Sequence, residues 1–246
     1  MPEPGYQEDL AYIHDAGFSG HCQGAAPGIL AMLRRHGFTR GLIADLGCGS
    51  GRFAALLLRA GYGVWGVDLS EAMIAMARGN APEAEFEIAS LLDAGIPRCR
   101  AAVSLGEGIN YLGAGPRGAL AVPRFFERVH AALEPGGVFT LDFSTPDRVP
   151  ASGRGRLWRE EEGWAVLAEI SGNAEKRTMR RRVVCYREVD GAFRRSEEVH
   201  RLRLYPAEEV AEQLRAVGFQ PRILRRYGCF PLLPGVAAIA AVKPLR

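Results

Sequence analysis

Short apolar runs alternate with segments of helical periodicity between residues 41 and 145. The apolar runs predict strands at 41–46, 63–67, 85–89, 101–105 and 138–143, and the segments between them predict helices at 52–60, 71–78 and 123–133. Strands that alternate with helices are typical of a mostly parallel sheet covered by helices on both faces. The pattern therefore predicts an α/β fold.

The two flanks of this region follow different patterns. Residues 6–16, and a second segment opened by Pro27 and stopped by Gly37, predict two helices within an amino-terminal region, 1–38. Residues 151–205 alternate at period two instead. Two candidate strands, 177–186 and 197–205, flank Asp190-Gly191, a strong hairpin signal. We expect an antiparallel β insertion there, and then a helix at 206–217 and strands at 222–227 and 236–242.

Composition and charge indicate an ordinary globular chain. Its 246 residues are 48% hydrophobic and 24% charged, with a formal net charge of +3, which suits one domain over 1–246. The five cysteines are scattered, so neither a disulfide framework nor a zinc site is predicted. We expect a cytoplasmic protein, because no secretory signal and no apolar stretch of membrane-spanning length is recognisable.

The sharpest chemical signal is Asp45-Leu46-Gly47-Cys48-Gly49-Ser50-Gly51, where a buried strand runs into a glycine-rich turn that opens a helix. Glycines permit a tight bend and let a ligand approach the main chain, and the amides at a helix start favour a carboxylate. Asp45 can meet an amino or sulfonium group. Asp68 ends the next strand, about 20 residues further on, which is the spacing of a ribose-binding carboxylate.

A nicotinamide cofactor is the competing interpretation of this turn. Its fingerprint is G-x-G-x-x-G, but this chain has G-x-G-x-G, with Arg52 where the third glycine of that fingerprint would lie. Asp45 would also repel a pyrophosphate. The pair Asp45 and Asp68 favours an amino-acid nucleoside cofactor over a dinucleotide.

These segments resemble class I S-adenosylmethionine-dependent methyltransferases. The glycine turn matches the family's D-x-G-x-G-x-G motif, and Gly66-Val67-Asp68-Leu69-Ser70 matches its second motif. Leu133-Glu134-Pro135-Gly136-Gly137 matches the turn before the fifth strand, and Ala216-Val217-Gly218-Phe219 resembles the turn before the last two strands. The resemblance covers residues 40–145 well and 206–243 more loosely.

The resemblance implies a three-layer, Rossmann-like sheet of seven strands, of which the last is antiparallel. It implies S-adenosylmethionine as cofactor, with Gly47, Gly49 and Gly51 beside its methionine part and Asp68 on its ribose. Many members carry an acidic residue after the third strand, whereas this chain has Ser90-Leu91 there and Asp93 slightly later. The full set of expected cofactor-binding residues is Tyr12, Asp45, Gly47, Cys48, Gly49, Gly51, Asp68, Leu69, Met73, Ser90, Leu91 and Gly106.

The acceptor side should lie beyond the carboxyl ends of the strands. Glu107 follows the strand 101–105, with Asn110 and Tyr111 close behind, and could be a base or hold an amine; alternatively it caps the next helix or faces solvent. In this family an amino-terminal helix can cover the cofactor, so His14 is a second catalytic candidate, although a structural histidine fits equally well. His200 and Tyr227 are weaker candidates, since each has an ordinary strand context.

The insertion is rich in arginine, but glutamates interleave with the arginines, as in Glu160-Glu161-Glu162 and Glu197-Glu198. Mixed charge at strand spacing is typical of a solvated sheet face and disfavours a nucleic-acid partner. We expect a small-molecule acceptor with an O, N or C nucleophile, the insertion serving as its roof or as a homodimer surface. No metal is expected, because Asp142-Phe143-Ser144 lacks an adjacent asparagine. A nicotinamide-dependent oxidoreductase and a non-catalytic cofactor-binding protein remain alternatives.

Overall fold

The computed structural model describes residues 5–115 and 117–245 and contains one large central sheet. Its seven strands lie in the order β10-β13-β5-β4-β1-β2-β3. Strands β1 to β5 run parallel, while β13 is antiparallel to both of its neighbours. The strand bounds are Leu42–Leu46 (β1), Gly63–Asp68 (β2), Glu85–Ile88 (β3), Cys99–Ser104 (β4), Leu133–Ser144 (β5), Gln220–Leu224 (β10) and Val236–Val242 (β13). The predicted α/β class and the antiparallel last strand are confirmed.

Helices cover both faces of the sheet, as its nearly continuous apolar strands require. On one face, buried side chains of α2 and α3 pack against β1, β2 and β4, and α4 lies beside α3. On the other face, α6 and α7 pack against β5 and β13. The helices are α1 (Glu8–Phe18), α2 (Gly20–Arg35), α3 (Arg52–Arg59), α4 (Glu71–Asn80), α5 (Gly108–Ala114), α6 (Ala121–Ala132) and α7 (Ala207–Val217), with short 3₁₀ turns at Gly118–Leu120 and Pro146–Arg148.

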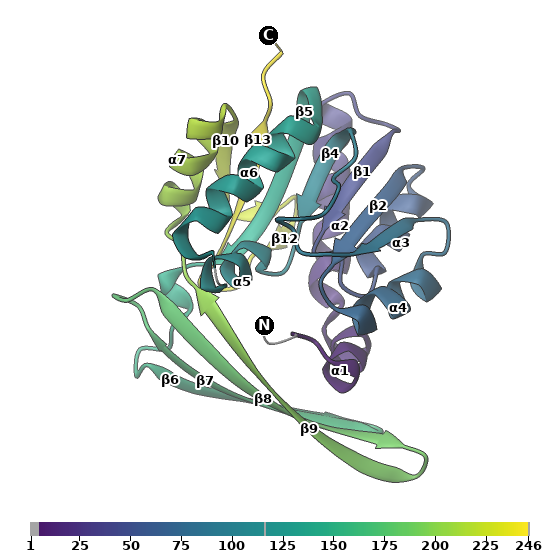
Figure 1. Ribbon diagram of the computed structural model, residues 1–246, viewed down its shortest axis with the longest axis vertical. Coiled ribbons are helices and arrows are strands. Elements are labelled where there is room, and N and C mark those ends of the chain that lie inside the picture. Colours follow the sequence, from purple (N-terminus) through teal and green to yellow (C-terminus); the bar gives the residue numbers. More distant parts are fainter. Residues whose placement is uncertain (1–4, 116, 246) are drawn as a thin grey trace.

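A second, antiparallel sheet lies across the carboxyl ends of the central strands (Figure 1). Its strands are β6 (Arg154–Glu161), β7 (Trp164–Asn173), β8 (Thr178–Val189) and β9 (Ala192–Arg203). Asp190 and Gly191 join β8 to β9 with φ of 51° and 79°, as a two-residue hairpin turn with both residues left-handed requires. The predicted insertion is therefore present, with four strands.

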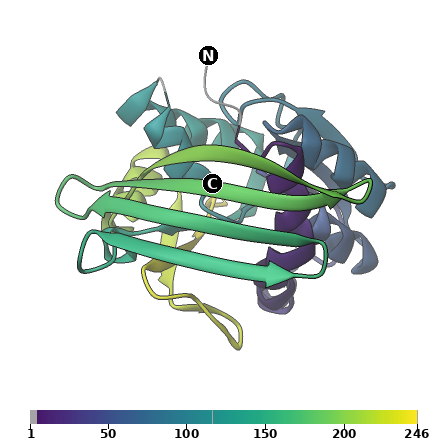
Figure 2. The ribbon, with the colours of Figure 1, turned by 90° about the horizontal axis from the view of Figure 1, so that it is seen from below.

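Helix α1 packs on the inner face of this second sheet, as the view from below shows (Figure 2). Leu10 and Ile13 of α1 are buried against Trp164 and Val183. The ion pair Arg194–Asp9 adds a polar contact along the same seam. Helix α1 is thereby held against the second sheet, next to the carboxyl ends of the central strands.

Several predicted boundaries were wrong, among them the start of β9, which lies at Ala192 and not at 197. Helix α2 begins at Gly20, and Pro27 lies inside it rather than opening it. A short hairpin of β11 (Arg226–Tyr227) and β12 (Phe230–Pro231) packs on this helix at Gly24 and Gly28. A Cβ on Gly28 would lie 2.2 Å from the Tyr227 carbonyl carbon, so the close approach requires glycine there. Strand β5 begins at Leu133 and passes through the Pro135–Gly137 turn, because Leu133 already pairs with Cys99. Strand β10 begins at Gln220, soon after α7 ends at Val217, rather than at Arg222.

Candidate active site

The glycine turn between β1 and α3 depends on backbone conformations that side chains disfavour. Gly47, Gly49 and Gly51 have φ of 80°, 52° and 75°. A Cβ on Gly51 would lie 2.8 Å from the Ala77 Cα of α4, so this glycine also permits close helix packing. The amides of Gly47 and Cys48 both donate to the Val67 carbonyl at 2.8 and 3.0 Å, which fixes the turn to the end of β2. The turn leaves the first amides of α3 available for an anionic group.

Asp45, the penultimate residue of β1, is a buried carboxylate with an unsatisfied oxygen. Its side chain is 2% exposed, and Oδ2 has no hydrogen-bond partner among the described residues. Burial, reinforced by the charge of Asp68, raises the pKa of Asp45 to about 7. A buried carboxylate with an unsatisfied oxygen is costly, and a cationic amine at this position would satisfy it.

Asp68 joins the end of β2 to the glycine turn. Its Oδ2 accepts from the Gly49 amide and its Oδ1 from the Ser70 amide, both at 2.9 Å. Burial is the main cause that raises the pKa of Asp68, and these amides oppose it. Leu69, the next residue, is 53% exposed although it is large and apolar, which suits a flat hydrophobic ligand. Met73 of α4 is buried beneath the turn, 3.9 Å from where a Cβ on Gly49 would lie.

The remaining cofactor-side candidates serve different local roles. The Cys48 thiol packs against Gly66, and a Cβ on Gly66 would lie 3.1 Å from the Cys48 sulfur. Ser90 accepts from the Leu92 amide through Oγ at 3.2 Å, and Leu91 is buried beside Gly108. The Gly106 amide donates to Asp142 at 2.7 Å. The Arg187 guanidinium carbon lies over the Tyr12 ring, 3.9 Å from the ring centroid, so Tyr12 faces the second sheet.

Glu107 neither caps α5 nor faces solvent. It has φ of 74° at the start of the helix and makes no side-chain cap. Its carboxylate receives two hydrogen bonds from Arg181 of β8, at 2.6 and 2.7 Å, and one from the Ser144 hydroxyl. Although burial alone would raise it, the pKa of Glu107 is lowered by the Arg181 charge and hydrogen bonds. Glu107 is thus an ionised, well-paired group and a weak base.

Two further polar clusters adjoin this ion pair. Tyr111 of α5 places its hydroxyl 2.9 Å from His200 Nδ1, and His200 Nε2 lies 3.0 Å from Glu198. His21 of α2 places Nε2 2.8 Å from Asp142, whose hydrogen bond raises the pKa of His21. The charge of Glu107 raises the pKa of both Tyr111 and His21, so both clusters lie near the Glu107–Arg181 pair.

His14 lies in α1 beside these clusters but holds no charge there. Its ring meets Tyr6 edge-on at 5.2 Å and stacks with Phe18 at 6.2 Å. Nδ1 is buried with no partner among the described residues, and burial lowers the pKa of His14. A neutral histidine in this aromatic setting fits a packing role as well as a chemical one.

The sequence interpretation did not single out Tyr6, His21, Arg181 or Glu198 as site residues. They come from the amino-terminal segment, from α2 and from strands β8 and β9 of the insertion, and each finds a partner across a long sequence separation. Arg181 and His200 are cross-strand neighbours on one face, which the strand register alone would have revealed.

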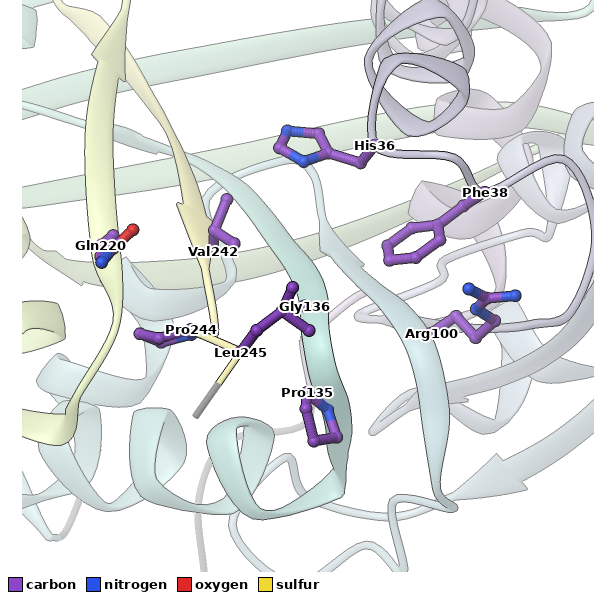
Figure 3. Close-up of a pocket in the computed structure, with 9 residues that line it drawn as sticks. All are labelled: His36, Phe38, Arg100, Pro135, Gly136, Gln220, Val242, Pro244 and Leu245. Carbon is purple, nitrogen blue, oxygen red and sulfur yellow. The ribbon is translucent and has the colours of Figure 1, made fainter.

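A surface hollow of about 520 Å³ lies elsewhere, at the opposite end of the central sheet (Figure 3). Arg100 at the start of β4 and Gly136 near the start of β5 line it, and the Arg100 guanidinium stacks on Phe38 at 4.5 Å. The glycine turn follows the carboxyl end of β1, so this hollow lies outside the site described above. The described residues contain no group of three or more His, Cys, Asp or Glu side chains arranged to hold a metal ion. Nor does any described helix have the length and apolar character needed to cross a membrane.

Comparison with known proteins places this geometry in a family. Residues 43–137 match a model of the methyltransferase domain. A trans-aconitate 2-methyltransferase of Variovorax paradoxus is 30% identical over 74% of this chain and 70% of its own length. A dTDP-3-amino-3,6-dideoxy-α-D-glucopyranose N,N-dimethyltransferase of Streptomyces fradiae is 26% identical over 95% and 94%. A sugar N-methyltransferase structure from Streptoalloteichus aligns with TM-score 0.80 and 20% identity over 99% and 96% of the two chains.

The fold and the site define a Rossmann-like enzyme that binds an amino-acid nucleoside. The chain belongs to the S-adenosylmethionine-dependent methyltransferases, with S-adenosylmethionine as cofactor and a small molecule as methyl acceptor. This assignment confirms the sequence-based prediction and replaces the oxidoreductase and non-catalytic alternatives. The unsatisfied oxygen of Asp45, the open glycine turn and the exposed Leu69 fit the amino group, carboxylate and adenine of that cofactor.

Proposed function

We propose that the enzyme methylates the nitrogen of an amine on a small, hydroxyl-bearing molecule. The observation that carries this proposal is the bidentate pair of Glu107 and Arg181. Arg181 is the buried cation of the acceptor side, and the carboxylate of Glu107 already neutralises it. His21 is likewise paired with Asp142. A carboxylate substrate would therefore meet no unpaired cation among these residues, whereas an amine meets acceptor oxygens.

The polar groups around this space suit a hydroxylated acceptor. Tyr6, Tyr111 and Ser144 contribute hydroxyls that can donate or accept, and these fix the orientation of sugar-like groups. The names of the Streptomyces fradiae and Streptoalloteichus relatives state N-methylation of amino sugars, which supports the same acceptor chemistry. The name of the Variovorax relative states methylation of trans-aconitate, a carboxylic acid, so methylation of a carboxylic acid is the competing outcome of the test.

For the cofactor we propose that Asp45 pairs with the amino group, that Gly47, Gly49 and Gly51 approach the methionine part, and that Asp68 takes the ribose hydroxyls. Bound S-adenosylmethionine supplies an already activated methyl group, so the chain's own residues need only orient the acceptor nitrogen and accept its proton. The amino-terminal region 1–38 would act as a lid and the insertion 151–205 as the roof of the acceptor space. Homodimer formation and the cytoplasmic location stay predictions.

The test is a methyl-transfer assay with radiolabelled S-adenosylmethionine against three acceptor sets. Nucleotide-linked and free amino sugars should be methylated, while the matching sugars with a hydroxyl in place of the amine and a set of di- and tricarboxylic acids should not. Transfer to the carboxylic acids alone would contradict the proposal.

A further inference from the structure

A chain of hydrogen-bonded side chains connects the amino-terminal segment to the second sheet. The hydroxyls of Tyr6 and Tyr111 bond to each other, Tyr111 reaches His200 Nδ1, and His200 Nε2 reaches Glu198. His200 and Glu198 are only 5% and 6% exposed. Buried polar chains of this kind are costly unless every member is satisfied, and here each one has a partner.

The chemistry of the end group sets the direction of the hydrogen bonds. Both oxygens of Glu198 accept from backbone amides, so the Glu198 side chain acts as an acceptor and Nε2 of His200 donates the hydrogen that faces it. A neutral imidazole then keeps a lone pair on Nδ1, and the Tyr111 hydroxyl donates to it. The Tyr111 oxygen has lone pairs left to accept from Tyr6 or from an acceptor group in the same space.

We propose that Tyr111, His200 and Glu198 form a proton relay that deprotonates the acceptor amine, an inference that rests on the proposed function. The amine nitrogen bonds to the methyl carbon as the carbon–sulfur bond breaks, and the electron pair of that bond remains on sulfur. The proton of the resulting ammonium passes to the Tyr111 oxygen while the hydroxyl proton of Tyr111 passes to His200 Nδ1. His200 then holds the positive charge beside the negative charge of Glu198.

The surroundings of the relay favour it over Glu107 as base. Two hydrogen bonds from Arg181 and one from Ser144 occupy Glu107 and keep its pKa low. Burial raises the pKa of Tyr111 well above its usual value, so Tyr111 passes a proton on rather than holding a phenolate. Four polar or charged side chains face His200. Tyr111 of α5 and Tyr6 of the amino-terminal segment meet its ring edge-on, and Glu198 lies on the same strand. Arg181 is its cross-strand neighbour on β8, and Glu107 neutralises the charge of Arg181.

The amino-terminal segment completes the relay. Glu198 accepts from the backbone amides of Tyr6 and Gln7, at 2.8 Å each, through its two oxygens. On the other side, Ser70, two residues after Asp68, donates its hydroxyl to the Tyr6 carbonyl at 2.6 Å. Tyr6 adopts a left-handed φ of 57° to make these contacts. The segment therefore joins the cofactor end of β2 to the carboxylate that orients His200.

The test compares pH profiles of kcat for the wild type, Tyr111→Phe, His200→Asn and Glu198→Gln on an amine that the wild type methylates. We expect Tyr111→Phe and His200→Asn to lose about 100-fold or more in kcat, and to change the position of the acid-side fall of kcat that the wild type shows. Glu198→Gln keeps an acceptor oxygen for one of the two backbone amides and should shift that fall to lower pH. Tyr186→Phe, an exposed tyrosine of β8, is the matched control and should behave as the wild type.

Titration with S-adenosylhomocysteine and circular dichroism confirm that each variant is folded. A folded Tyr111→Phe or His200→Asn with the wild-type kcat and the wild-type acid limb would overturn the relay. Nitrogen chemical shifts of ¹⁵N-histidine-labelled wild-type enzyme give a second readout, with hydrogen expected on Nε2 of His200, and hydrogen on Nδ1 alone would also overturn it. No wild-type turnover of any amine would instead refute the proposed acceptor, so the two failures are distinguishable.

Discussion

Asp45→Asn should stabilise the ligand-free enzyme while weakening its hold on the cofactor. In the folded chain the Asp45 carboxylate is buried, and one oxygen has no partner among the described residues. Its pKa rises from 3.8 to about 7 for that reason. Between these two values the unfolded chain binds fewer protons than the folded one, so the free energy of unfolding falls as pH rises. An asparagine carries no charge to bury.

The size of the effect follows from the shift. One pKa unit corresponds to about 1.4 kcal/mol, so the ionised Asp45 costs the folded state about 4 kcal/mol at pH 8 and less than half of that at pH 5. The amide introduced by Asp45→Asn has its own cost, about 1–3 kcal/mol if unsatisfied, but that cost does not change with pH. The free energy of unfolding of the variant, relative to that of the wild type, should therefore be about 3 kcal/mol larger at pH 8 than at pH 5.

Urea denaturation of both ligand-free proteins at the two pH values measures this difference. Asp190→Asn makes the same chemical change at an exposed hairpin turn and is the control for the substitution itself. A variant-minus-wild-type difference that is equal at pH 5 and pH 8 would refute the argument that Asp45 is strained by its charge. Calorimetric titration of the same variant should show weaker binding of S-adenosylmethionine, by about 2–4 kcal/mol, from loss of a charge-assisted contact.

Three other substitutions test the site and its frame. Asp68→Ala should weaken S-adenosylmethionine binding by about 2–4 kcal/mol, and wild-type affinity by calorimetry would mean that the ribose is held elsewhere. Gly51→Ala should lower the free energy of unfolding by about 1–3 kcal/mol, because the new Cβ would collide with Ala77 and the φ of Gly51 is 75°. An unchanged midpoint of urea denaturation would disprove that packing argument. Glu107→Gln leaves Arg181 buried without its counter-charge and should lower the free energy of unfolding by about 3–5 kcal/mol. Adding Arg181→Met should restore most of that free energy, and a double variant no more stable than Glu107→Gln alone would contradict the pairing.

The central fold could be predicted because its signals are local. The run from Asp45 to Gly51 contains the strand end, the turn and the helix start in one short segment, and Asp190-Gly191 specifies its hairpin alone. Helix α2 was mispredicted because Pro27 is a strong local signal for a helix start, whereas the helix begins at Gly20 and continues through Pro27. The hairpin at Tyr227 and Phe230 that packs on this helix is about 200 residues away in the sequence and invisible to a local pattern.

The acceptor side was harder to predict for the same reason. Tyr6, Arg181 and Glu198 acquire their roles only when the second sheet folds over the strand ends. In the sequence, Arg181 and Glu198 belong to a mixed-charge pattern that is typical of a solvated face, and half of that pattern does face solvent. His200 has an ordinary strand context, and only its register with Arg181 places it on the inner side. Glu107 was identified by its position after β4, but its arginine partner was not.

The amides of Tyr6 and Gln7 donate to Glu198, and a Cβ on Gly5 would lie 4.0 Å from the His200 ring. Anything fused ahead of residue 5 is thus tethered directly beside the reacting groups, while the chain leaves the molecule at the far end of the central sheet (Figure 1). For purification, labelling or surface attachment, the carboxyl end is the place to modify this enzyme. An affinity tag at the amino end should depress turnover until a protease removes it.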